Sequence, residues 1–172
     1  MSGDVFEPAH DGEQLPIYEN GLDVLVSWHP ATRVPAGTPH GATAICLIPT
    51  GQVVLVRTKA GLWSLPGGRP EPGETWEDTL RREVREEACA EVTQARLLGF
   101  GRGECIRGRD LGKVLVRGLW LASVDLLPWV DEFEMLERRS FPAAEARTLV
   151  RDALAGGHKQ IITRMFQEAG LV

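Results

Sequence analysis

Short apolar segments, separated by glycine, proline and polar residues, predict β-strands along most of the chain. Runs rich in β-branched residues occupy positions 22–28, 42–48 and 53–57. A Thr-Gly-Gln turn joins the last two runs, so they predict a hairpin. Positions 97–101, 113–124 and 135–141 predict further strands, with loops at 102–112 and 128–134.

Helical spacing of apolar residues predicts three helices. Trp76, Leu80, Val84 and Ala88 follow at intervals of four, which favours a helix over 75–90 with one buried face. Pro142 is placed to open a second helix, which ends near Gly156 and Gly157, and a third helix covers 158–169. Because hairpins and separate helices are mixed along the chain, the predicted class is α+β with a mixed sheet between helices.

Length and composition indicate one ordinary globular domain. The chain has 172 residues, of which 43% are hydrophobic and 25% are charged. We expect a single domain over 1–172, with residues 1–14 flexible because they are polar and rich in glycine and aspartate.

Apolar runs and net charge restrict the possible binding partners, and the cysteines bear on the cellular location. No apolar run reaches the roughly 20 residues of a membrane span, and no secretory signal is evident, so we expect no membrane partner. The net charge of −5 argues against a nucleic-acid duplex but permits a small phosphorylated ligand bridged by a cation. Three widely separated cysteines favour a reducing cytoplasm. The sequence leaves a monomer or a homodimer open.

Three glutamates gather on one side of the first predicted helix. Glu83, Glu86 and Glu87 stand at i, i+3 and i+4, so their side chains lie together and repel one another. Glu87 also falls beside the apolar stripe, where a carboxylate is costly without a compensating cation. A solvated helix with pairs such as Arg82–Glu86 is the alternative. Glycine-rich turns at 66–68 and 71–74 favour a metal or phosphate site, because they let the backbone approach a ligand closely.

These residues resemble the box of the Nudix hydrolase superfamily, of the MutT-like kind. The box covers 68–90, and the match consists of Gly68, five residues, Glu74, seven residues, and then Arg82, Glu83, Val84, Arg85, Glu86, Glu87 and Ala88. The late glycine of the pattern is Cys89 here, which leaves the geometry of the helix end to be determined. The order of elements from 42 to 169 is also similar to the Nudix α/β/α sandwich.

The resemblance implies hydrolysis of a phosphoric anhydride with Mg²⁺ or Mn²⁺. The expected substrate is a small nucleotide-type molecule, such as a nucleotide sugar, a nucleoside di- or triphosphate or an oxidised nucleotide. By the same resemblance Glu83, Glu86 and Glu87 are metal ligands, together with the carbonyl of Gly68 or its neighbour. Arg82 would orient a box glutamate, and Glu74 would form an ion pair with Arg82.

Two parts of the expected site depend on loops. The general base is either a box glutamate or Glu134, which could also be an extra ligand or a solvated carboxylate. Arg102, Arg107 and Arg109 stand among glycines and are candidates for binding substrate phosphate as a mobile lid. The other interpretation of these arginines is a solvated basic loop.

The sequence leaves two other functions open. A Nudix-fold module that binds a nucleotide or sugar phosphate without hydrolysing it is the main alternative, although all three box glutamates are present. An isomerase of an isoprenoid diphosphate is a third, weaker one, because the cysteines are poorly placed for it.

Overall fold

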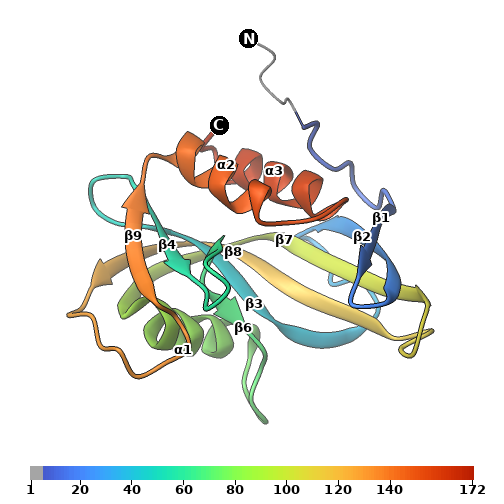
Figure 1. Ribbon diagram of the computed structural model, residues 1–172, viewed down its shortest axis with the longest axis horizontal. Helices are drawn as coiled ribbons and strands as arrows, with labels where there is room; N and C mark the ends of the chain where they lie inside the picture. The colour runs from blue at the N-terminus through green and yellow to red at the C-terminus, as the bar shows by residue number, and fades with distance from the viewer. Residues whose placement is uncertain (1–5) are drawn as a thin grey trace.

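A mixed β-sheet with helices on both faces forms the centre of the protein (Figure 1). The computed structural model describes residues 6–172. Within that range the elements follow in the order β1 (Leu15–Glu19), β2 (Leu22–Pro30), β3 (Thr38–Leu47), β4 (Val53–Arg57), β5 (Trp63–Ser64), β6 (Gly67–Gly68), α1 (Trp76–Ala88), β7 (Ala90–Arg107), β8 (Val114–Leu126), β9 (Glu137–Phe141), α2 (Ala143–Asp152) and α3 (His158–Glu168).

The strand order explains how distant segments come together. The main path of the sheet is β1-β2-β7-β8-β3-β4-β5, while β6 pairs with β3 and β9 pairs with β4. The β3–β8 pair is parallel and its neighbours are antiparallel, so the sheet is mixed as predicted. The predicted β3–β4 hairpin is also confirmed, with Cys46 opposite Val54.

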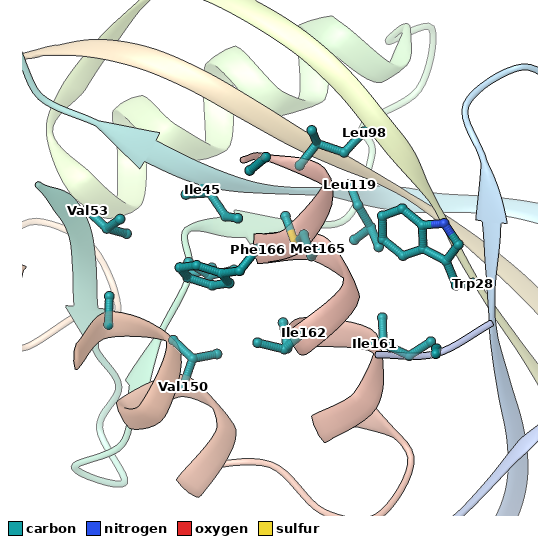
Figure 2. Packing of buried hydrophobic residues seen from close by; sticks show 14 of the residues in the cluster. Trp28, Ile45, Val53, Leu98, Leu119, Val150, Ile161, Ile162, Met165 and Phe166 are labelled. Carbon is teal, nitrogen blue, oxygen red and sulfur yellow. The ribbon is translucent and has the colours of Figure 1, made fainter. Parts of the chain in front are cut away.

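Two apolar cores lie on opposite faces of the sheet. The first helix, α1, buries Leu80 and Val84 against one face. Helices α2 and α3 cover the other face, and Figure 2 shows side chains of α3 turned toward Ile45 and Leu119 of the sheet. This arrangement confirms the α/β/α sandwich.

Local signals set the limits of α1. Thr75 caps its N-terminus in a reciprocal capping box with Asp78, at 3.1 and 3.0 Å. Cys89 ends the helix in the left-handed conformation, with φ of 49°. A glycine enters this conformation without steric cost, which accounts for the glycine at that position in the box pattern. The cysteine therefore leaves the course of the helix end intact.

One prediction about a loop was wrong, and the flexibility expected of residues 1–14 stays a prediction. Within residues 6–14, Ala9 is buried, its N–H donates to Gln160 O at 3.2 Å, and Asp11 forms a β-bridge with Trp28. Residues 1–5 of that prediction lie outside the described residues. The predicted loop at 102–112 is mostly strand, because β7 continues to Arg107.

Pairing on both edges explains the long hairpin of β7 and β8. Gly103 stands opposite Val26 of β2 and Leu115 of β8, so backbone hydrogen bonds on two sides override the weak strand propensity of glycine. The structure also adds β1, which the sequence did not predict. No helix within residues 6–172 is both long and apolar enough to cross a membrane.

Candidate active site

Two box glutamates lie against the short glycine strand β6. The backbone N–H of Gly67 donates to Glu87 Oε1 at 2.8 Å. A Cβ atom on Gly68 would fall 2.5 Å from Glu83 Oε1, so only glycine allows this carboxylate to pack on the backbone. Pairing of β6 with Ala42 and Thr43 of β3 fixes the strand in place. The structure thus brings three predicted ligands together: Gly68, Glu83 and Glu87.

Arg82 connects the remaining glutamates. Its guanidinium lies 2.8 Å from Glu74, 2.8 Å from Glu83 and 3.3 Å from Glu86, and it donates to Arg69 O at 2.8 Å. The expected pairing of Arg82 with Glu74 and with box glutamates is therefore present. Through these bonds one side chain orients the box helix, the preceding loop and two candidate ligands.

The electrostatic environment of Glu87 is unfavourable for its negative charge. Burial raises the pKa of this carboxyl to about 7, and the charges of Glu83 and Glu134 act in the same direction. The hydrogen bond from Gly67 and the nearby charge of Arg117 oppose the increase but do not cancel it. The site thus holds crowded carboxylates with too little positive charge around them.

A divalent cation fits this donor set. Carboxylate and carbonyl oxygens are the ligands that Mg²⁺ and Mn²⁺ prefer, and a cation would compensate the burial and the repulsion that raise the pKa of Glu87. Within residues 6–172, no three acidic, histidine or cysteine side chains are already arranged around a common metal position. Arg82 forms ion pairs with both Glu83 and Glu86.

A cavity of about 600 Å³ adjoins Glu87 and extends under α2 and α3. Gly67 and Glu87 line it beside the box helix, and Ile161 and Ile162 of α3 line it on the helical side. Gly101 and Gly103 belong to its lining on the sheet, where the absence of side chains leaves room. The cavity joins a charged site to a largely aliphatic compartment, which suits a phosphate joined to a less polar group.

Several polar residues of this cavity were missed by the sequence prediction. They come from four elements and comprise Glu19, His40, Arg117 and His158. Arg117 did leave a signal, because it is the only charged residue between Val114 and Val124 of β8. The other residues carry no local pattern, since their proximity arises only from strand pairing and helix docking.

The predicted arginines have separate locations. Arg102 is among the lining residues, but its guanidinium donates to Ala36 O at 3.0 Å and to Glu104 at 3.4 Å. Arg107 forms an ion pair with Asp23 of β2, and Arg109 donates to Asn20 O at 2.9 Å. Neither Arg107 nor Arg109 lines the cavity, so the three do not converge on one ligand.

Glu134 lies on the segment between β8 and β9, next to Met135, which lines the cavity. Its side chain is exposed, yet its charge is close enough to raise the pKa of Glu87. Cys89 anchors the same segment, because the Val130 N–H donates to its Sγ at 3.4 Å. The tertiary structure thus places this glutamate near the box, as its candidate role requires.

A comparison of the whole sequence identifies the domain. The family model of the NUDIX domain matches residues 38–165, which include β3 to most of α3 and all the box residues. The chain is 48% identical over 49 residues to a Bacillus subtilis protein assigned as an 8-oxo-dGTP diphosphatase, covering 28% of this chain and 33% of that protein. It is 46% identical over 48 residues to the nucleoside triphosphatase NudI of Enterobacter sp., covering 28% and 31%. These matches span about a third of each relative.

The fold has counterparts of known structure. A pyrophosphohydrolase of Bacillus subtilis superimposes with a TM-score of 0.65 at 21% identity, over 86% of this chain and 92% of the other. At that identity the superposition shows a shared fold and nothing more.

Proposed function

Because this chain belongs to the Nudix family, we propose that it is a divalent-metal-dependent pyrophosphohydrolase of small nucleotide derivatives. The observation that carries the proposal is the placement of Glu83 and Glu87 against the glycine strand β6, where Gly67 and Glu87 line a cavity of about 600 Å³. The candidate substrates are nucleotide sugars, nucleoside di- or triphosphates and oxidised nucleotides. The names of the relatives support nucleoside triphosphates and oxidised nucleotides as substrates.

In this proposal the glutamates of the box bind metal and its arginine orients them. Glu83, Glu86 and Glu87, with a backbone carbonyl at Gly68, would hold Mg²⁺ or Mn²⁺. When bound, such a cation neutralises phosphate charge and makes water more acidic. Arg82 orients Glu83 and Glu86 through the ion pairs described above.

The proton of the attacking water needs an acceptor near the box. Glu134 is our candidate, because its charge already acts on Glu87 and its segment borders the cavity. A box glutamate is the other candidate. Glu134→Gln separates them: loss of turnover with retained substrate affinity assigns the base to Glu134, while unchanged turnover assigns it to the box.

A nucleotide panel tests the proposal. Purified protein is incubated with nucleotide sugars, nucleoside di- and triphosphates and oxidised nucleotides, each with Mg²⁺, Mn²⁺ or EDTA, and released phosphate, pyrophosphate or mononucleotide is measured. We expect metal-dependent cleavage of at least one class. Binding of a nucleotide without any cleavage would instead support the alternative, a Nudix-fold binding module.

We also propose a cytoplasmic location. Cys46, Cys89 and Cys105 are free and buried, and burial raises the pKa of the Cys46 thiol to about 12, so this thiol is unreactive.

Sedimentation of the purified chain would decide between a monomer and the homodimer left open by the sequence.

A further inference from the structure

Arg117 of β8 is a half-buried cation that the proposed metal chemistry does not use. Burial lowers the pKa of its guanidinium, while the charges of Glu87 and Glu83 act in the opposite direction. Its side chain lines the cavity beside Gly67 and Glu87. Desolvation of a charge is costly, so the retention of an arginine here calls for a counterion.

Within the described residues, few of the N–H donors of this guanidinium have a hydrogen-bond acceptor in the protein. Arg117 Nη1 donates to Thr43 Oγ1 at 3.1 Å, and no Asp or Glu of residues 6–172 forms an ion pair with it. A guanidinium carries five N–H donors in a planar fork. Most of these donors therefore remain for a ligand in the cavity.

Two imidazoles and a second guanidinium also lie near Arg117. His40 and His158 line the same cavity, and the charge of Arg117 acts on both rings. Arg69 lies near enough to act on Arg117 as well. Burial lowers the pKa of both imidazoles from 6.5, so the positive charge on this cavity comes from its arginines and not from the histidines.

We propose that Arg117 forms an anion subsite, independent of the divalent cation, that binds a phosphate oxygen of the substrate from the cavity side. The identity of the ligand, a pyrophosphate group, rests on the proposed function. A planar fork matches two phosphate oxygens at once, which a lysine cannot do. The box glutamates would hold the metal, and Arg117 would bind the pyrophosphate from the cavity that Gly67 and Glu87 line. Arg117 is thereby a binding and positioning residue.

Titration calorimetry with inorganic pyrophosphate in EDTA tests the subsite without turnover. We compare the wild type with Arg117→Met, Arg117→Lys and the control Arg33→Met, which removes an exposed charge that does not line the cavity. We expect pyrophosphate to bind the wild type and Arg33→Met equally. Binding to Arg117→Met should be about 10- to 100-fold weaker, the range for a lost charge-assisted hydrogen bond, with Arg117→Lys between them.

A structural role for Arg117 predicts a different result. If the residue only supported Thr43 and the sheet, Arg117→Met would lower the melting temperature in EDTA. If it serves a ligand, methionine fills the space without a desolvated charge, and the melting temperature stays level or rises. A fall in melting temperature combined with unchanged pyrophosphate affinity would overturn the proposal.

The outcomes also separate this subsite from the proposed hydrolase activity. Absence of pyrophosphate binding to the wild type in EDTA, or equal affinity of the wild type and Arg117→Met, overturns the subsite and leaves hydrolysis standing. Binding that depends on Arg117 in a protein that cleaves no nucleotide of the panel overturns the hydrolase and leaves the subsite. With an active substrate, Arg117→Lys should raise KM more than it lowers kcat, because the contact is present before the reaction begins.

Discussion

Glu74 and Arg82 form a two-pronged ion pair between the box loop and α1, with Nε–Oε2 at 2.8 Å and Nη2–Oε1 at 3.0 Å. Glu74 also accepts the backbone N–H of Glu71 at 2.6 Å. Because Arg82 in turn contacts Glu83 and Glu86, the pair transmits the position of the loop to two candidate metal ligands.

This ion pair predicts a dependence of stability on acid pH. Hydrogen bonds from Arg82, and next from Glu71, lower the pKa of Glu74 from 4.5 to about 2 in the folded protein. A depressed pKa contributes stability above 4.5 that is lost as the pH falls toward 2. We expect Glu74→Gln to be less stable at neutral pH and to lose less stability over that window. Urea unfolding at several pH values checks this, and parallel curves for the two proteins would contradict it.

The box glutamates should be needed for turnover but not for folding. We expect Glu86→Gln or Glu87→Gln to lower kcat by at least about 100-fold, because loss of an anionic ligand weakens the hold on the metal. In EDTA the stability should stay level or rise, since one repelling charge is gone. Glu77→Gln, on the exposed face of the same helix, is the control. Normal activity of both box variants would exclude these glutamates as ligands.

Added metal should stabilise the fold through the same residues. A metal concentration about ten times Kd contributes about 1.4 kcal/mol by linkage, so millimolar Mg²⁺ or Mn²⁺ should raise Tm. The gain should vanish when Glu83, Glu86 and Glu87 are all replaced by alanine. Differential scanning fluorimetry with and without EDTA measures it. An equal gain in the triple variant would place the metal elsewhere.

Arg107 and Arg109 should be dispensable for catalysis. Both bond to β2 or to the turn before it and lie outside the cavity lining, so replacing both by alanine should leave KM and kcat unchanged at low and high salt. The lost surface ion pair should cost at most about 1 kcal/mol of stability. A higher KM at low salt alone would restore a substrate role for these arginines.

Cys89 offers a matched pair of variants at the helix end. Its φ of 49° is costly for a residue with a Cβ atom, so Cys89→Gly should relieve about 1 kcal/mol of strain that Cys89→Ala retains. Both variants lose the contact of Sγ with Val130. We therefore expect the glycine variant to unfold at a higher urea concentration than the alanine variant. The reverse order would show that strain at this position is negligible.

The relative positions of residues close together in the box helix could be predicted from sequence, because helical geometry alone determines them. The rise and turn of α1 place Glu83, Glu86 and Glu87 on one side, and the capping signal at Thr75 sets where the helix begins. The box spacing then implied the family, and with it the sandwich. The pairing of Arg82 with Glu74 was also within reach, since both belong to the box.

The wall of the cavity could not be predicted in this way. Arg117 comes to the glutamates through the parallel pairing of β3 with β8, across a bulge between Pro39 and Ala42. His158 reaches the cavity only because α3 docks on the sheet. Neither contact leaves a local pattern.

The sequence by itself determined the box helix, its three carboxylates and the α+β class, since these depend on periodicity and spacing over short stretches. The tertiary structure decided the rest. It extended β7 through the glycines to Arg107, directed the guanidiniums of Arg102, Arg107 and Arg109 to other partners, and brought Arg117 beside Glu87. These outcomes follow from hydrogen bonding between strands far apart in the chain, where the pairing partner, and not the local residue type, sets the conformation and the neighbours of each side chain.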